Sequence, residues 1–247
     1  MNQFNLIHIF SFTLLPAGLF LLLFLLLKDR SRGNKTIKTK MDILFAICCF
    51  NAVLYVIYKF YQAHFYDGYD FVFVYNLPLH FCNLNLLLLP LAIKTRNKTL
   101  MAYQVYFGTL LAFFALFTID PAFRGEPFFE FTCLVYFYYH SMLAVMPFLF
   151  LTFKMFVPTF KEAWKPVLLL IFITFIIHIV NIILRTTGIA SEANYFFTFG
   201  LRGDPFTEIF WRILPFNFFF LLPALVIVFV PYICGVVLLF KWKIGKK

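Results

Sequence analysis

Long apolar stretches separated by short polar segments dominate the chain. A helix needs about 20 apolar residues to cross a hydrocarbon core about 30 Å thick. Seven stretches meet or approach this length, so we expect an all-α fold, a single bundle of seven membrane-spanning helices. The expected spans are 6–27, 41–61, 72–93, 99–118, 131–152, 166–184 and 213–240. The connecting segments are short except for 185–212, and the whole of 1–247 is therefore expected to be one membrane domain.

Basic residues gather in every second polar segment. Four such segments, 28–40, 94–98, 153–165 and 241–247, together hold sixteen Lys and Arg residues. The alternate segments carry few basic residues and the acidic side chains Asp67, Asp70, Asp120, Glu126, Glu130, Glu192, Asp204 and Glu208. Because short cytoplasmic loops are enriched in Lys and Arg, we expect the N-terminus outside and the C-terminus in the cytoplasm. A missed or additional helix would break this alternation.

The composition agrees with a membrane protein and disfavours other classes. Hydrophobic residues make up 63% of the chain, more than a soluble domain of 247 residues can bury. The net charge of +10 lies in short loops, so it indicates topology and not a nucleic-acid partner. Five cysteines without a CxxC pair predict neither a disulfide framework nor a structural zinc site. The 39 Phe residues are typical of an AT-rich bacterial genome, and we expect a multi-pass protein of a bacterial plasma membrane.

Two local signals stand near the C-terminal end. Residues 205–212 (PFTEIFWR) predict a short interfacial helix, with Glu208 and Arg212 four residues apart and Trp211 suited to the headgroup level. Three prolines follow in the last span, and each removes a backbone donor, so kinks are expected there. They are Pro215, Pro223 and Pro231.

Polar side chains inside the spans are the candidates for function, because they are costly in hydrocarbon. Span 72–93 is the richest (YNLPLHFCNLNLLLLP), and spans 131–152 and 166–184 each add a histidine. The candidates are Asn76, His80, Cys82, Asn83, Asn85, Tyr139, His140, His178 and Asn181. At 1.5 Å per residue, His80, His140 and His178 fall about 9–14 Å below the outer edge. One polar layer is therefore expected in the outer half of the bilayer.

Cys82 is the candidate nucleophile of this layer. A thiol becomes a nucleophile when an adjacent imidazole takes its proton. On an ideal helix His80 lies about 200° around the axis from Cys82, so the base is expected from a neighbouring helix, where His140 has a suitable depth. The groups available to bind the oxyanion of an acyl intermediate are Asn76, Asn83, Asn85 and Tyr139. A plainer role stays open for Asn85, His178 and Asn181, which also suit hydrogen bonds between helices.

The segment 78–83 (PLHFCN) resembles the YwaF-like bacterial integral membrane proteins, whose eukaryotic relative is the acyltransferase called transmembrane protein one-six-four. His140 and the pair Asn194–Tyr195 fit the same resemblance, which covers most of the chain. It implies a fold similar to the androgen-induced-gene-one family of membrane lipid hydrolases, which use an intramembrane nucleophile with a His. It also implies Cys82 as the nucleophile, His140 as the base and His80 as an orienting or binding group.

Three functions remain in competition. The first is a lipid acyltransferase or acyl hydrolase that acts on a phospholipid or lysophospholipid through Cys82 and His140, without a cofactor or metal. Substrate-binding or orienting roles then fall to His80, Asn83, Asn76, Tyr139, His178 and Asn181. The second is a zinc hydrolase with three histidine ligands, His80, His140 and His178, which no HxxxH pair or membrane carboxylate supports. The third is a non-catalytic protein that binds or transports a solute. The acyl donor, the acceptor and the oligomeric state stay open.

Overall fold

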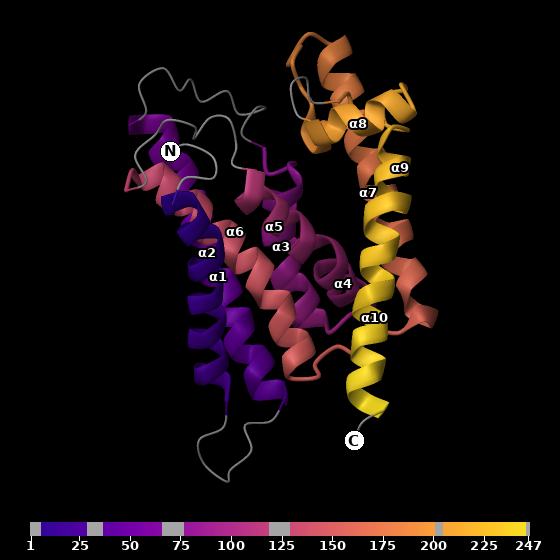
Figure 1. The fold of residues 1–247 in the computed structure, drawn as a ribbon. Helices are drawn as coiled ribbons and strands as arrows, with labels where there is room; N and C mark the ends of the chain where they lie inside the picture. The colour runs from indigo at the N-terminus through magenta and orange to yellow at the C-terminus, as the bar shows by residue number, and fades with distance from the viewer. Residues whose placement is uncertain (1–5, 29–36, 66–76, 119–128, 201–204, 246–247) are drawn as a thin grey trace. The chain divides into compact units, whose positions relative to one another are not determined.

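The computed structural model describes residues 6–28, 37–65, 77–118, 129–200 and 205–245 (Figure 1). These residues form helices and turns, and no strand occurs among them. Six of the described helices are long and apolar enough to cross a membrane: Leu6–Leu27, Ile37–Tyr61, Lys98–Thr118, Phe131–Thr152, Phe160–Thr186 and Leu221–Lys241. The all-α, multi-pass prediction is thereby confirmed, while the count of seven and the orientation stay predictions.

The chain divides into two compact units, and each is described by itself. Unit 1 comprises residues 1–70 and 85–156, and unit 2 comprises residues 71–84 and 157–247. Helix α3 (Phe81–Thr95) contributes its first four residues to unit 2 and the rest to unit 1.

Unit 1 is a bundle whose core lies between α6 and the span before it. Besides its part of α3, unit 1 contains α1 (Leu6–Leu27), α2 (Ile37–Phe65), α4 (Lys98–Tyr103), the π-helix η1 (Gln104–Gly108), α5 (Thr109–Thr118) and α6 (Phe131–Thr152). Helix α6 packs against α1, α5 and, to a smaller extent, α2. The side chains of Leu116, Cys133 and Phe137 form a fully buried cluster. Polar contacts reinforce this packing, since the Tyr136 hydroxyl donates to the Ala115 carbonyl at 2.7 Å.

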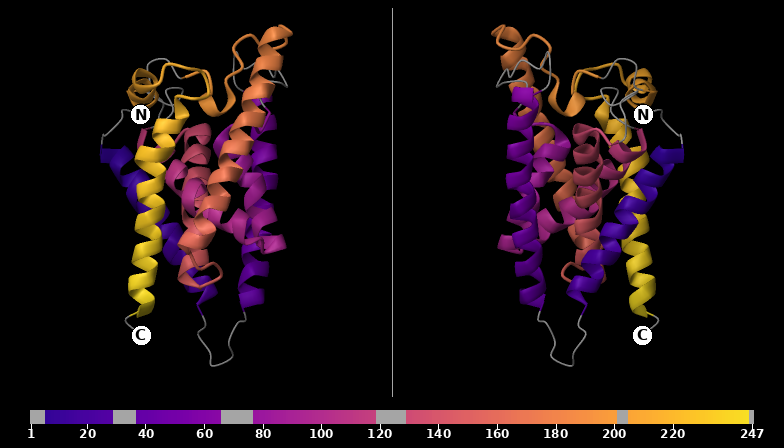
Figure 2. Two further views of the ribbon diagram at one scale, coloured as in Figure 1. Left: turned by 90° about the vertical axis from the view of Figure 1, so that its right-hand side faces the viewer. Right: turned by 90° about the vertical axis from the view of Figure 1, so that its left-hand side faces the viewer.

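Unit 2 contains two long helical stretches, and the shorter elements η3 and α8 lie between them in the sequence. Its elements are α7 (Phe160–Thr186), the 3₁₀ turn η3 (Tyr195–Phe197), α8 (Pro205–Ile213), α9 (Leu221–Ala224), the π-helix η4 (Leu225–Phe229) and α10 (Val230–Gly245). In Figure 2, α9, η4 and α10 continue as one yellow rod. Helix α8 confirms the short helix predicted at 205–212, and Arg212 donates to Glu208 at 2.7 Å. Its position at the headgroup level stays a prediction.

The start of α3 differs from the expected span 72–93. Residues 72–76 lie outside the described residues, Leu77–His80 form a turn and a bend, and the helix begins only at Phe81. Pro78 explains the late start. Proline disfavours the helical conformation of the residue before it and has no N–H to donate. The expectation that His80 and Cys82 share one ideal helix is therefore wrong.

The last expected span, 213–240, also begins later in the structure. Residues 214–220 are not helical, and Phe218 there has a φ of +66°. Pro215 removes a backbone donor at this break. The spanning helix runs over Leu221–Lys241, and its π segment, η4, lies between Pro223 and Pro231. The distortion expected from the prolines thus takes two forms: a break in the helix at 214–220 and a π-helical turn at Leu225–Phe229.

Candidate functional site

Cys82 lies in the first turn of α3. The carbonyl of His80 accepts the first helical hydrogen bond, from the Leu84 amide at 2.9 Å. His80 is therefore the N-cap residue, and Cys82 is the second residue of the helix. The N–H groups of this first turn have no acceptor within the helix, and they form the positive end of its dipole. Negative charge that develops near Cys82 is stabilised there.

The turn before α3 packs against the segment that follows α7. The ring of His80 lies 5.1 Å from that of Tyr195 and 5.6 Å from that of Phe197, measured between centroids. Phe81 meets Phe196 in the same way at 5.3 Å. Cys82 itself is half-buried. The residues around the candidate nucleophile are therefore positioned by contacts within unit 2.

Asn181 joins α7 to this segment through three hydrogen bonds. Its amide nitrogen donates to the Tyr195 carbonyl at 2.8 Å and to the Thr198 hydroxyl at 2.9 Å, and its oxygen accepts from the Tyr195 amide at 2.9 Å. The same hydroxyl lies 2.9 Å from Nδ1 of His178. Asn181 and Thr198 are fully buried. Two of the predicted orienting residues, His178 and Asn181, thus share the Thr198 hydroxyl as a hydrogen-bond partner.

The segment 194–200 is closed by its own side chains. Asn194 donates to the Gly200 carbonyl at 2.6 Å and accepts from the Phe199 amide at 3.0 Å. Phe196 and Phe197 have φ values of +57° and +53°, in the left-handed region that bulky residues rarely adopt. Such strain persists only where the surroundings hold it. The pair Asn194–Tyr195 therefore has a defined role: one residue closes the loop and the other contacts His80.

His140 lies on α6 in unit 1, and its protonation pattern suits a base. Its Nδ1 atom is 2.8 Å from the Tyr136 carbonyl one turn earlier. Because a carbonyl only accepts, Nδ1 carries the hydrogen, and Nε2 of the neutral ring then carries the lone pair. The ring is half-buried and stacks obliquely on Tyr136 at 4.2 Å. This is the tautomer that accepts a proton at Nε2.

Tyr139 belongs to an aromatic cluster in the same unit. Its ring lies 5.7 Å from that of Tyr55 and 6.5 Å from that of Tyr58. Its neighbour Tyr138 donates to Asn51 at 2.6 Å, which ties α6 to α2. Around Tyr139 the structure shows packing between α2 and α6.

Sequence reasoning missed Gln104, which pairs with the predicted residue Asn85. The Gln104 amide donates to Asn85 at 3.1 Å, and both side chains are buried. A Cβ atom added at Gly108 would lie only 2.6 Å from Gln104 Oε1, so this glycine leaves room for the amide. The available signal was an amide inside an apolar span with a glycine four residues later. Asn85 thus has the plainer of its two predicted roles, a bond between helices.

The predicted site residues are distributed over both units. His80, Cys82, Asn83, His178 and Asn181 belong to unit 2, and Tyr139 and His140 belong to unit 1. Asn83 is half-buried at the third position of α3, and Asn76 lies outside the described residues. Among the described side chains, no group of three or more His, Cys, Asp or Glu residues is arranged to hold a metal ion. The zinc alternative finds no support in that part of the chain.

Comparison with protein-family models yields a match over nearly the whole length. The model described as the TMEM164 family matches residues 3–234. Comparison with curated proteins and with solved structures yields no match. The family match confirms the resemblance that rests on the segment 78–83, and it also covers His140 and the loop 194–200.

Proposed function

Because the chain belongs to the TMEM164 family, we propose that it is a membrane enzyme that transfers or hydrolyses lipid acyl groups, with Cys82 as the nucleophile and His140 as the base. The observation that carries the proposal is the position of Cys82 in the first turn of α3, where backbone N–H groups lack helical acceptors. The substrate class is a phospholipid donor, with a lysophospholipid or water as acceptor, in a bacterial plasma membrane.

In the first half of the reaction, His140 takes the thiol proton and Cys82 Sγ attacks the ester carbonyl carbon. An S–C bond forms, and the carbonyl electrons move onto oxygen. The N–H groups at the start of α3 and the Asn83 side chain stabilise that oxyanion. The C–O ester bond then breaks, and the departing lysolipid oxygen takes the proton from the His140 imidazolium.

In the second half, the acyl group is released from its thioester. The hydroxyl of a lysophospholipid, or a water molecule, loses its proton to His140 and attacks the thioester carbon. The S–C bond breaks and the thiolate receives the proton from His140. A lysophospholipid acceptor gives acyl transfer, and water gives hydrolysis.

The remaining residues position these groups. His80 caps α3 and holds the turn against Tyr195, and Asn181 with His178 anchors the segment 194–200 through Thr198. This arrangement supports a role for the segment as a wall of the substrate site. Asn76 and Tyr139 complete the proposed set as substrate-orienting residues.

The direct test uses the purified full chain in nanodiscs with a phosphatidylcholine that carries an isotope-labelled acyl chain, and a lysophosphatidylethanolamine acceptor. We expect labelled diacyl product and an acyl adduct on the protein that hydroxylamine removes. Cys82→Ala should abolish both. His140→Gln should lower the rate by about 10²–10⁴-fold, the usual contribution of a general base.

The matched control is Cys234→Ala, since Cys234 is also half-buried and lies on α10. This variant should retain activity and adduct. Thermal melting of each variant separates a lost nucleophile from a lost fold. Full activity in a folded Cys82→Ala protein would refute the proposal.

The proposal includes seven membrane crossings, with the N-terminus outside and the C-terminus in the cytoplasm. The six long helices and the basic segments between them support it. Single cysteines introduced at Ser191 and at Lys98, two exposed positions, test it in intact cells in a background without other cysteines. A membrane-impermeant maleimide should label position 191 directly and position 98 only after permeabilisation. The reverse pattern would invert the orientation, and equal labelling would change the count.

A further inference from the structure

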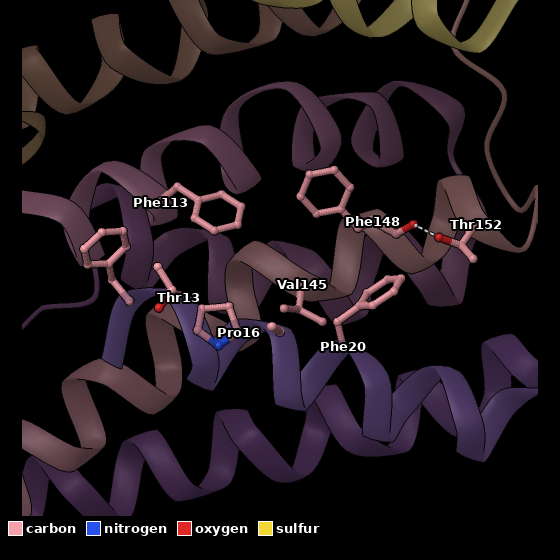
Figure 3. A pocket seen from close by; sticks show the side chains of 9 residues that line it. Thr13, Pro16, Phe20, Phe113, Val145, Phe148 and Thr152 are labelled. Carbon is pink, nitrogen blue, oxygen red and sulfur yellow. Dashed lines mark hydrogen bonds between the residues drawn. The ribbon is translucent and has the colours of Figure 1, made fainter. Parts of the chain in front are cut away.

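Unit 1 carries an elongated apolar groove of about 560 Å³ between α1, α5 and α6. Figure 3 shows Thr13 and Phe113 at one end of the groove and Phe20 and Thr152 at the other. The two threonine hydroxyls donate to carbonyls one turn earlier on their own helices, at 2.6 and 2.9 Å. Its volume lies within the range of ligand sites, and its lining suits a hydrocarbon chain.

Beyond Phe20 a stack of rings leads to two lysines. The Phe20 and Phe24 rings stack at 6.1 Å, and the Phe24 and Phe153 rings stack at 5.7 Å, with interplanar angles of 15° and 18°. Lys28 Nζ lies 5.7 Å from the centroid of Phe24, and Lys40 Nζ lies 4.5 Å from that of Phe153. Because Phe24 and Phe153 are stacked on each other, ammonium groups from two segments gather at one end of the groove.

We infer that this groove binds an anionic glycerophospholipid, with an acyl chain between α1, α5 and α6 and the phosphate beside Lys28 and Lys40. Helices α1 and α6 are both apolar and long enough to cross a membrane, so an open groove on them faces hydrocarbon. From Phe20 to Lys28 a helix rises about 12 Å, which places the cations at the level of the headgroups when the chain lies in the groove. Basic groups at such an end attract anionic lipids.

The lipid in this groove is distinct from the proposed substrate. Neither Cys82 nor His140 lines the groove. The two lysines bound the basic segment 28–40, which is predicted to be cytoplasmic, whereas the acyl transfer is proposed for the outer half of the bilayer. The bound lipid fills the space between α1 and α6 and stabilises their packing. This inference therefore stands independently of the proposed chemistry.

Native mass spectrometry tests the inference on the full chain released from nanodiscs with equal amounts of phosphatidylglycerol and phosphatidylcholine of the same acyl composition. We expect retained phosphatidylglycerol to exceed phosphatidylcholine by about thirtyfold, as two basic groups near a lipid surface provide. The double variant Lys28→Gln/Lys40→Gln should bring the ratio close to one. Ala17→Trp, which fills the exposed floor of the groove, should remove most of both lipids.

Two matched controls accompany these variants. Lys98→Gln/Lys161→Gln removes two exposed basic residues elsewhere, and Leu22→Trp adds an indole on an exposed face of α1 that does not line the groove. Both should retain lipid as the unchanged protein does. Equal retention of the two lipids by the unchanged protein, or variants that match their controls, would overturn the inference. A dimer that Ala17→Trp alone dissociates would assign the groove to a second copy of the chain instead.

Discussion

In unit 1 the described cross-helix polar bonds join one helix to another, whereas in unit 2 Asn181 joins a long helix to the irregular segment 194–200. Tyr138 reaches from α6 to Asn51 on α2, and Gln104 reaches from η1 to Asn85 on α3. Asn181 reaches instead from α7 to the backbone of Tyr195. Burial does not follow this division, because 61% of the most apolar stretch of α6 is buried but only 17% of that of α1, the same share as for α7.

The difference in hydrogen-bond partners between the units shows how this protein stabilises irregular backbone. Buried irregular backbone requires hydrogen-bond partners from the protein, because its polar groups are shielded from water. In unit 2 the side chains of Asn181 and Asn194 supply such partners for the strained segment 194–200. In unit 1, Asn97 and Glu130 accept from backbone amides at helix starts, and the polar bonds between helices fix how those helices pack. We therefore expect the same type of substitution to cost more in unit 2.

Asn181→Leu should have the largest effect on stability. It removes three hydrogen bonds and leaves the Tyr195 backbone without its partner, so we expect a loss of about 2–4 kcal/mol. Thermal melting in detergent measures the loss of stability, and hydrogen exchange should show that local opening is centred on 194–200. Asn85→Leu, which removes one bond in unit 1, is the counterpart and should cost less. Equal losses would erase the distinction between the units.

Gly108→Ala should destabilise unit 1 by about 1–3 kcal/mol, because the new methyl group collides with the buried Gln104 side chain. The control is Gly235→Ala on α10, where nothing lies within 4 Å of the added Cβ. That change should be neutral or raise the melting temperature, since alanine favours helix. Adding Gln104→Ala to Gly108→Ala should recover part of the loss. If it recovers none, the collision is not the cause.

Thr198→Val should cost about 1–2 kcal/mol, because it leaves Asn181 and His178 without a shared buried partner. The matched control is Thr174→Val on α7, which is also buried but donates to a carbonyl of its own helix at 2.7 Å. Its loss should be close to zero. Chemical denaturation in mixed micelles can compare the two. A control as damaging as Thr198→Val would indicate general packing loss.

Tyr138→Phe should have the smallest effect. The bond to Asn51 is short, at 2.6 Å, yet polar bonds between membrane helices contribute only about 0.6 kcal/mol on average. A double-mutant cycle with Asn51→Ala measures the coupling. A coupling well above about 1.7 kcal/mol would exceed the known range for such pairs and would make unit 1 as dependent on polar bonds as unit 2.

Apolar length alone predicted much of the helical framework. The spans 6–27 and 131–152 match α1 and α6 in both bounds, and the Glu208–Arg212 spacing predicted the ion pair of α8. These features depend on residues close in sequence. The late start of α3 was also readable from Pro78, but the continuous apolar run around it indicated a longer helix.

The arrangement around the candidate site depends on distant residues, and it was less accessible from the sequence. The contact of His80 with Tyr195 joins positions 115 residues apart, which no local pattern encodes. The π-helix that carries Gln104 has no composition of its own, and its partner Asn85 lies on another helix. The depths of the histidines were predicted from the bounds of their spans. The depth of His80 rested on a helix that begins at residue 72, whereas α3 begins at Phe81.

The shortness of α3 also links the candidate site to the thickness of the bilayer. Its 15 residues rise only about 22 Å, less than the roughly 30 Å of hydrocarbon in a typical bilayer. A short hydrophobic element favours a thinner membrane or draws the bilayer inward around itself. Cys82 stands at the first turn of this short helix, beside the turn from which the helix begins. Lipids with shorter acyl chains would therefore relieve hydrophobic mismatch at the residue proposed to attack them.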